Sequence, residues 1–442
     1  MADVRPLPGI RYAAGSDLSA LVTPPYDVIS PEAQARYYAR DPRNIIRLEL
    51  GREEPGDDDL DNQYTRAAQT FAEWRLQGVM RQDEPALYLY EQRFTVAGAT
   101  YRKVSLLARV RLEPWEARVI LPHERTHRKA KEDRLRLMRA CAANLSPLMA
   151  LYDDPAGELA ARFDSILDSP PEVAVVDEAG EGHRLWLVRD ERLVAFTEDF
   201  FAARQLYIAD GHHRYETALT YRDEVAAQRK DPLAPGDAAN FMLMALSAIE
   251  DPNLVVLPTH RMLRDLDPRR VSALESALEG QFTVERMDAA ASAEALLAEL
   301  GRAESAGERC AFVLVAPGKR LLLRLRPEGR ASMGQLSGAN ADRSSAWRSL
   351  DLAILHELVF HQALGVSDEA VQAGEHVTYT RDPEEALAAV ESGKNGAMLA
   401  ALVASTPPSA IRDVARAGDR MPQKSTYFYP KLITGLVVNP LW

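Results

Sequence analysis

Two runs of alternating side chains, residues 87–96 and 101–112, constrain the fold of this chain more than any other feature. The link Ala97-Gly98-Ala99-Thr100 between them is short enough for a β-hairpin. Further strand-like runs, such as residues 173–176 and 206–208, alternate with helical stretches. The pattern predicts a fold of the α+β or α/β class.

Local signals locate several other elements. Ser30 followed by Pro31 predicts a helix start, because serine caps the first N–H groups and proline has no N–H to satisfy. Residues 44–50 are predicted to form a short strand, and the charged residues 129–143 a helix. Residues 397–404 form one of the longest apolar runs, far short of the ~18 residues of a membrane span, and predict a buried strand.

Composition excludes several classes of protein. The 442 residues carry 53 Lys and Arg against 65 Asp and Glu, a net charge of −12, which disfavours a nucleic-acid partner. Two cysteines are too few for a disulfide scaffold or a cysteine-rich zinc site. The N-terminus shows no signal peptide. We therefore expect a cytoplasmic protein with small-molecule substrates and no membrane partner; the sequence does not indicate its oligomeric state.

Changes in the pattern of elements along the chain predict four segments. Residues 1–115 form an N-terminal α/β region with the hairpin, and residues 116–260 contain the expected catalytic core. Residues 261–345, where helices alternate with strands, form an α+β insertion or lobe. Residues 346–442 form a C-terminal α/β region that returns a strand to the core.

The segment Asp210-Gly211-His212-His213-Arg214 is the sharpest local signal. A strand-like run ends at it, the glycine permits a tight turn, and a helical stretch follows. The first N–H groups and the dipole of a helix attract anions, and two imidazoles and a guanidinium are suited to phosphate. The segment predicts a phosphate site in which Asp210 holds a divalent cation or orients an imidazole. A structural turn with Asp210 as its cap is the alternative.

A second segment, His123-Glu124-Arg125-Thr126-His127, matches the H-E-x-x-H motif of zinc peptidases. A proline precedes it and a strongly basic stretch follows, which disfavours a bound dication. A metallopeptidase is therefore the less favoured interpretation. The alternatives are a solvated basic helix with a polar N-terminus, and Glu124 acting as a general base beside a phosphate-binding surface.

The third segment runs from Met421 to Lys431. Residues 418–425 imitate the phosphate loop G-x-x-x-x-G-K-S, but that loop joins a strand to a helix, whereas this segment joins a helix to a strand. Lys424, Ser425, Thr426 and Lys431 remain candidates for binding an anion. A polar turn before an aromatic core strand is the alternative.

Together, these segments resemble a large bacterial family called domain of unknown function one-thousand-and-fifteen, and the resemblance covers essentially the whole chain. The residues that carry it are Pro24-Pro25-Tyr26-Asp27-Val28-Ile29-Ser30, Pro122-His123-Glu124 with Asp133-Arg134 and Ser146-Pro147, Asp210-Gly211-His212-His213-Arg214-Tyr215, and residues 421–431. The family name implies no function by itself.

Three of the segments are also similar to the archaeal free-serine kinases of the ParB/sulfiredoxin-like superfamily. Those enzymes carry a Pro-His-Glu segment, a Val-Asp-Gly-His-His-Arg-Trp turn and a Tyr-Thr-Trp-Tyr-Pro run. This chain has counterparts in the same order at residues 122–124, 209–215 and 425–430. The resemblance implies a ParB-like mixed-sheet catalytic core with additional α/β segments.

The resemblance to the kinases also implies roles for individual residues. Glu124 is the base for the serine hydroxyl, and Asp210 and His213 are further catalytic residues. Gly211, His212, His213 and Arg214 hold the donor phosphates, and Thr426 and Tyr427 are candidate substrate contacts. To these we add, from the residues themselves, Lys424 and Ser425 as donor contacts and His123 as a substrate contact. The expected cofactor is Mg²⁺, held by the donor phosphates and by Asp210.

We therefore expect a phosphotransferase that moves a phosphoryl group to the hydroxyl of free L-serine, giving O-phosphoserine. Pyrophosphate, ADP and ATP are the candidate donors. The alternatives are a phosphatase or another phosphohydrolase, the zinc peptidase, and a ParB-like nucleotide- or DNA-binding protein. The net charge of −12 and the lack of a recognisable helix-turn-helix argue against DNA binding.

Overall fold

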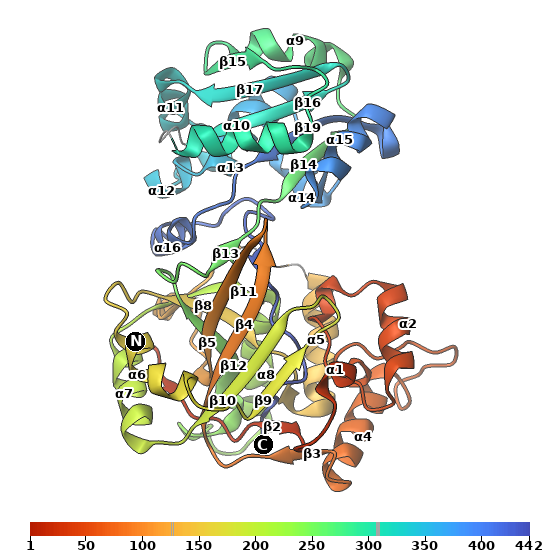
Figure 1. Cartoon of the computed structure of the whole chain (residues 1–442), viewed down its shortest axis with the longest axis vertical. Helices are drawn as coiled ribbons and strands as arrows, with labels where there is room; N and C mark the ends of the chain where they lie inside the picture. Colours follow the sequence, from red (N-terminus) through yellow and green to blue (C-terminus); the bar gives the residue numbers. More distant parts are fainter. Residues whose placement is uncertain (125, 127, 306–309) are drawn as a thin grey trace. The chain divides into compact units, whose positions relative to one another are not determined.

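A computed structural model describes residues 1–124, 126, 128–305 and 310–442. It divides the chain into two compact units (Figure 1). The first unit comprises Met1–Val255 and Pro430–Trp442, and the second comprises Val256–Tyr429. The chain therefore leaves the first unit once and returns to it for its last residues.

The first unit is built on a nine-stranded sheet. Its order is β6-β11-β8-β12-β5-β4-β10-β9, with β1 beside β5. Strands β6 and β11 run parallel, as do β8 and β12, and the other pairs are antiparallel. The strands are β1 (Val4–Arg5), β4 (Leu87–Val96), β5 (Ala99–Arg111), β6 (Ile120–Leu121), β8 (Leu148–Tyr152), β9 (Val173–Val176), β10 (Gly182–Val188), β11 (Leu206–Asp210) and β12 (Phe241–Ala248). The expected α/β class with a mixed sheet is confirmed.

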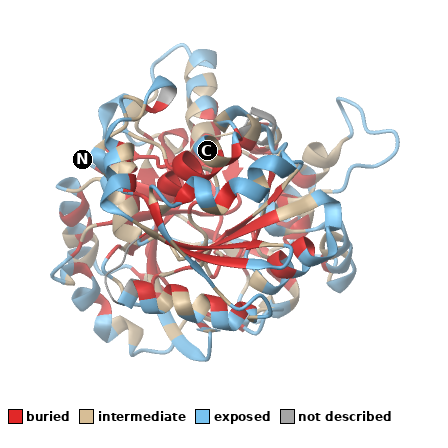
Figure 2. Ribbon diagram, turned by 90° about the horizontal axis from the view of Figure 1, so that it is seen from above, coloured by how far each residue is buried: buried red, intermediate tan, exposed pale blue. Residues whose placement is uncertain are grey.

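The hairpin predicted from the alternating runs is also confirmed. Val96 pairs with Ala99, so that Ala97 and Gly98 form a two-residue turn. Both turn residues have positive φ, 48° and 80°, which suits the right-handed twist of the two strands. Apolar side chains on one face of the sheet pack against α6 (Glu158–Leu167), α7 (Glu191–Ala202) and α8 (His212–Gln228). Buried residues lie along the strands that are visible in Figure 2, and exposed residues lie on the outer helices and loops.

Polar side chains on β4 and β5 hold the returning C-terminal segment. Gln92 and Lys103 are opposite each other across β4 and β5 and are fully buried. The amide of Gln92 donates to the carbonyl of Lys431 at 3.0 Å, and the amine of Lys103 to that of Pro430 at 3.4 Å. These contacts fix the backbone of Lys431 against the sheet.

Short helices precede and follow the hairpin in sequence: α1 (Leu18–Leu21), α2 (Pro31–Arg40), α3 (Ile46–Glu49), α4 (Gln63–Leu76) and α5 (Arg128–Cys141). The predicted start of α2 is confirmed, since Ser30 Oγ accepts from the N–H of Ala33. The predicted strand at residues 44–50 is wrong, because α3 lies there. The amide oxygen of Asn44 accepts from the N–H of Ile46, which favours a helical turn over an extended chain.

The second unit has a six-stranded sheet in the order β15-β17-β16-β19-β14-β18, antiparallel throughout. Helices α10 (Ala293–Ser305) and α15 (Pro383–Ser392) supply apolar residues to one core cluster with its central strands. The buried strand expected at residues 397–404 is confirmed as β19, which ends at Val403. The strands are β14 (His260–Arg264), β15 (Phe282–Arg286), β16 (Ala311–Ala316), β17 (Lys319–Leu325), β18 (Val377–Thr380) and β19 (Ala397–Val403).

The two units differ from the four segments expected from the sequence. Strands β4 and β5 of residues 1–115 pair with β10 and β12 of residues 116–260, so these two segments share one sheet. In the same way, β16 of residues 261–345 pairs with β19 of residues 346–442. Among the helices that the structure describes, none has both the length and the apolar character needed to cross a membrane.

Candidate functional site

Two sequence motifs meet at one edge of the nine-stranded sheet. Strand β6 precedes His123 and Glu124, and its parallel neighbour β11 ends at Asp210. Parallel strands present their carboxyl ends at the same edge, so the segments that follow β6 and β11 lie together. The backbone N–H of His123 donates to Nε2 of His212 at 3.2 Å, which ties the two motifs directly.

The Asp-Gly turn leads β11 straight into the 17-residue helix α8. Gly211 has φ 95°, and a Cβ there would lie 2.7 Å from Cβ of Leu148, so both the conformation and the space require glycine. No side chain caps the helix after this turn. The N-terminus of α8 is therefore a site where N–H groups and the helix dipole can receive an anion.

Asp210 accepts one cation on each carboxylate oxygen. The amine of Lys431 donates to Oδ1 at 2.7 Å, and Nη2 of Arg214 donates to Oδ2 at 3.0 Å. Burial opposes ionisation, but the charges of Lys431 and Arg214 outweigh it and hold the pKa of Asp210 well below its ordinary value. The carboxylate therefore stays ionised and fixes both cations beside the helix end.

Arg214 is a positioning residue in this arrangement. Besides Asp210, its guanidinium donates to the carbonyl of Pro147 and, at 3.4 Å, to the hydroxyl of Ser146. Burial opposes its charge, but Asp210 and more distant acidic groups raise the pKa of Arg214. Arg214 thus holds Asp210 in place beside Lys431 and the helix end, and its predicted phosphate-binding role stays a prediction.

A buried ion pair lies behind Arg214. Ser146 donates to Oε1 of Glu49 at 2.9 Å, and Nη1 of Arg134 lies 3.7 Å from the same oxygen. The guanidinium of Arg134 also lies 4.1 Å from the centre of the Tyr26 ring. Residues from all four segments that carry the family resemblance thus form one connected network, from Tyr26 to Lys431.

The two buried histidines are fixed by backbone groups. Nδ1 of His123 donates to the carbonyl of Ile208 at 2.6 Å. Nε2 of His212 accepts from the His123 N–H, so a neutral His212 carries its proton on Nδ1. Their rings meet edge to face, with centroids 4.7 Å apart. His213, in the first turn of α8, and Glu124, after β6, are each half-buried.

The geometry does not support the zinc-peptidase interpretation of residues 123–127. Its two histidines must lie one turn apart on a helix, but His123 and Glu124 are not helical. Arg125 and His127 lie outside the described residues. Thr126 donates to Oε2 of Glu216 at 2.6 Å, and Lys131 donates to the same oxygen at 2.7 Å. These bonds hold the segment against α8.

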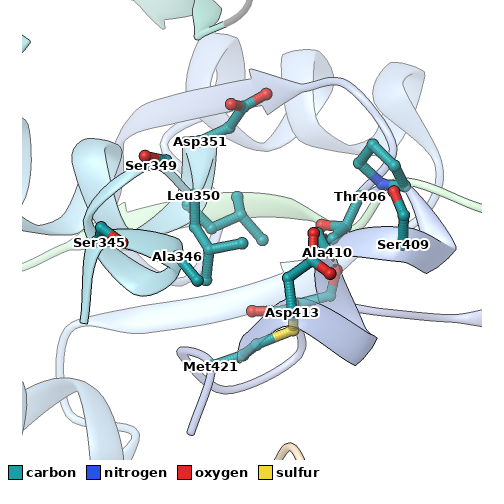
Figure 3. Close-up of a pocket in the computed structure, with 13 residues that line it drawn as sticks. Ser345, Ala346, Ser349, Leu350, Asp351, Thr406, Ser409, Ala410, Asp413 and Met421 are labelled. Atoms are coloured by element: carbon teal, nitrogen blue, oxygen red, sulfur yellow. Dashed lines mark hydrogen bonds between the residues drawn. The ribbon is translucent and has the colours of Figure 1, made fainter. Parts of the chain in front are cut away.

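Four predicted site residues, Lys424, Ser425, Thr426 and Tyr427, belong to the second unit, and their roles stay predictions. There, the carbonyl of Ser425 accepts from the hydroxyl of Thr406 at 2.9 Å. Ser425 lines a cavity of about 510 Å³ in this unit (Figure 3). The other lining residues are Ser345, Ala346, Ser349, Leu350, Asp351, Leu352, Thr406, Pro407, Ser409, Ala410, Asp413 and Met421.

Lys103 is a residue that the sequence analysis missed. It is fully buried, and desolvation together with the nearby charge of Lys431 lowers its pKa to about 7. Its position in an alternating strand carries no signal, because lysines are common on the exposed faces of strands. Its burial becomes evident only in the structure, where the returning segment covers it and its amine donates to the carbonyl of Pro430.

Asp210, Glu216 and Glu49 do not fit a Mg²⁺ ion held by the protein. Both oxygens of Asp210 pair with cations, Glu216 pairs with Lys131, and Glu49 lies beside Arg134. A dication on Asp210 would be repelled by the charges of Lys431 and Arg214.

The second unit contains a separate charged cluster around His361, on the π-helix η5 (Leu355–Leu364). Nδ1 of His361 lies 3.4 Å from Glu357 Oε2, and Nε2 lies 3.1 Å from Asp368 Oδ1. The amide of Asn340 donates to both carboxylates. Burial opposes the charged imidazole, but the two carboxylates outweigh it and raise the pKa of His361 to about 9.

This cluster predicts a pH-dependent stability. The pKa of His361 is raised from 6.5 to about 9, so the stabilisation is complete below about pH 6.5 and is lost as the pH rises to about 9. We expect calorimetric unfolding of the full chain to show up to about 3 kcal/mol of such loss, absent in His361→Gln. His376→Gln is the control, because Nδ1 of His376 contacts the Arg264 carbonyl rather than a carboxylate. An unchanged pH profile in His361→Gln would contradict the assignment.

Comparisons with known proteins were made for the whole chain. Among the curated proteins, none matches it. A conserved hypothetical protein from Pyrococcus furiosus aligns with 13% identity and a TM-score of 0.35, over 73% of this chain and 94% of that one. A free serine kinase in complex with AMP aligns with 13% identity and a TM-score of 0.34, over 70% and 83%. C-terminally truncated SbnI from Staphylococcus aureus aligns with 10% identity and a TM-score of 0.32, over 75% and 87%.

One family model matches residues 4–353, and it is described as "Protein of unknown function (DUF1015)". This match takes in the segments that meet at the Asp-Gly turn, apart from the C-terminal one. It covers well over half of the chain and confirms the resemblance that the motifs indicate. The chain belongs to the DUF1015 family.

Proposed function

We propose that this protein transfers a phosphoryl group from pyrophosphate or a nucleotide to the hydroxyl of a small hydroxy amino acid, with free L-serine as the first candidate. The observation that carries the proposal is the uncapped N-terminus of α8, beside the amine of Lys431 and two histidines. Glu124 follows the neighbouring parallel strand at the same edge.

The helix end would hold the donor. Phosphoryl transfer requires positioning and neutralisation of charge more than covalent help from the protein. The N–H groups of α8 and the amine of Lys431 supply fixed donors for the oxygens of the transferred group, and Asp210 keeps the amine in place. His212 and His213 begin the helix, and in the proposed complex they would contact the same oxygens.

Glu124 would accept the proton of the acceptor. In this step the serine hydroxyl oxygen bonds to the terminal phosphorus, the anhydride P–O bond breaks, and the shortened donor leaves with the bonding pair. The hydroxyl proton passes to the carboxylate of Glu124. A half-buried carboxylate at the end of β6 is suited to this task, because it lies at the same edge as the anion site. The resemblance of the three motifs to free-serine kinases supports serine as the acceptor.

A donor–acceptor screen tests the proposal. ATP, ADP and pyrophosphate are each combined with serine, threonine and homoserine, and phosphate-ester formation is followed by ³¹P NMR. We expect O-phosphoserine with at least one donor, and a loss of donor affinity in Arg214→Lys, because an ammonium cannot bridge Asp210 and the Pro147 carbonyl. Arg229→Lys, just after the same helix and paired with Asp237 on the surface, is the control.

One outcome would overturn the proposal: no donor phosphorylates any hydroxy amino acid while phosphoserine is hydrolysed rapidly, which would favour a phosphatase. An Arg214→Lys variant that folds normally and retains full activity would overturn only the positioning role of Arg214.

A further inference from the structure

The turn between β9 and β10 brings together three side chains that commonly ligate metals. Asp177, Glu181 and His183 each offer a ligand atom, and these atoms lie within 4.8 Å of one another. Glu181 and His183 are buried, while Asp177 retains 18% of its side-chain exposure. The cluster lies at the β9 edge of the nine-stranded sheet and is reachable from solvent through Asp177.

His183 is oriented by a neighbour and directs one nitrogen into this cluster. Its side chain is fully buried, and Nδ1 hydrogen-bonds to the hydroxyl of Tyr90 at 2.8 Å. That hydroxyl also receives a hydrogen bond from the backbone of Ile433. Nε2 is buried and lies 3.3 Å from Oδ2 of Asp177, but without the alignment of a good hydrogen bond. A buried imidazole nitrogen without a hydrogen bond is unfavourable unless something else occupies its lone pair.

Asp177 is equally fixed. Its Oδ1 accepts from the N–H groups of Ala179 and Glu181, each at 2.9 Å, so Oδ2 is left facing His183. Zinc–nitrogen and zinc–oxygen bonds are about 2.0–2.2 Å, and at a tetrahedral angle two such ligand atoms lie about 3.3–3.5 Å apart. The 3.3 Å separation of Nε2 and Oδ2 therefore matches two ligands of one ion.

We propose that Asp177, Glu181 and His183 bind a divalent transition-metal ion of the zinc class, with one position left for water. One imidazole and two carboxylates suit zinc better than Mg²⁺, which prefers oxygen ligands. With the metal on Nε2, the ring proton is on Nδ1, which donates to the hydroxyl oxygen of Tyr90; such a contact fixes a ligating histidine. The ion would fasten the β9–β10 turn.

The cluster around His361 also contains one histidine and two carboxylates, but its geometry differs from that of the cluster around His183. There, both ring nitrogens face carboxylates, and an ion can take only one of them. The amide of Asn340 also donates to both of those carboxylates. Its geometry suits a charged imidazole, so that cluster is an internal comparison for the test.

The experiment uses the full chain, freed of metal by a chelator and dialysed. Binding of Zn²⁺ is measured by calorimetry, and Co²⁺ is added as a spectroscopic probe of the ligand set. We expect one tight site per chain, at least 100-fold weaker in His183→Gln and about 10–100-fold weaker in Tyr90→Phe. Glu178→Gln and His361→Gln are the controls, and both should bind normally. Glu178 lies on the same turn but pairs with Arg36 and Arg40.

Absence of a stoichiometric site, or unchanged zinc affinity in His183→Gln, would overturn the proposal. If His183→Gln does not fold, Asp177→Asn replaces it, because the amide oxygen can still accept the N–H groups of the turn. The readout is metal affinity, so its outcome does not depend on the proposed phosphotransferase activity. A zinc ion lost in His183→Gln would also not count as evidence for a zinc peptidase.

Discussion

Replacing Glu124 by glutamine is expected to lower the rate of phosphoryl transfer by about 10²–10⁴, the usual range for loss of a general base. Donor affinity should change little, because the proposed donor site consists of the N-terminus of α8 and Lys431. Single-turnover kinetics with the best donor and acceptor gives the rate, and calorimetry with the donor alone gives its affinity. The split between a large effect on rate and a small effect on binding identifies a group that acts in the chemical step.

Glu116→Gln is the matched control for this experiment. It makes the same chemical change at an exposed glutamate in the connection between β5 and β6, in the short helix η2 (Trp115–Ala117). It should leave both rate and affinity unchanged. His127→Ala should also have a much smaller effect than Glu124→Gln. Equal losses of rate and donor affinity in Glu124→Gln would contradict the assigned role.

Asp210→Asn is expected to destabilise the protein by about 3–5 kcal/mol, because it leaves two cations without their counter-charge. The side chains of Arg214 and Lys431 are only 8% and 13% exposed, so water cannot replace the carboxylate. Urea unfolding of both proteins at pH 7 measures the difference. The lowered pKa of Asp210 adds a pH test: its contribution is present above about pH 4 and is lost as the pH falls below that value.

Asp223→Asn is the control, since it removes a carboxylate from the same helix. Asp223 pairs with Arg222, but its side chain is 67% exposed, so the loss should stay within about 0.5 kcal/mol. An Asp210→Asn variant as stable as Asp223→Asn would show that the buried ion pairs contribute little.

Local features of the fold could be predicted from the sequence. The hairpin and the Asp-Gly turn each depend on contiguous residues. Each contains a glycine, Gly98 or Gly211, at a position where the backbone has a positive φ, so the sequence itself indicates the turn. The exception is instructive: residues 44–50 look like a strand because Ile45, Ile46 and Leu48 are apolar, yet all three are buried around the short helix α3. Burial favours apolar residues in either conformation, so such a short run does not distinguish them.

The partners within the site could not be predicted in the same way. Arg134 and Glu49 are 85 residues apart, and Lys431 and Asp210 are 221 apart. Such pairs follow from the strand order and from the return of the chain, and a single sequence specifies neither. Glu124, Asp210 and Lys431 were recognisable as chemically capable groups, whereas the structural role of Arg214 depends on its contact with Pro147.

The return of the chain at Pro430 has a consequence for the order of synthesis. A ribosome completes the strands and helices of residues 1–255 and then makes all of the second unit before it reaches Lys431. Until then, Asp210 has Arg214 but lacks its second cation, and Lys103 and Gln92 lack the backbone carbonyls that they bind. A nascent chain therefore cannot complete the surroundings of Asp210 until it has folded residues 430–442 back onto the sheet.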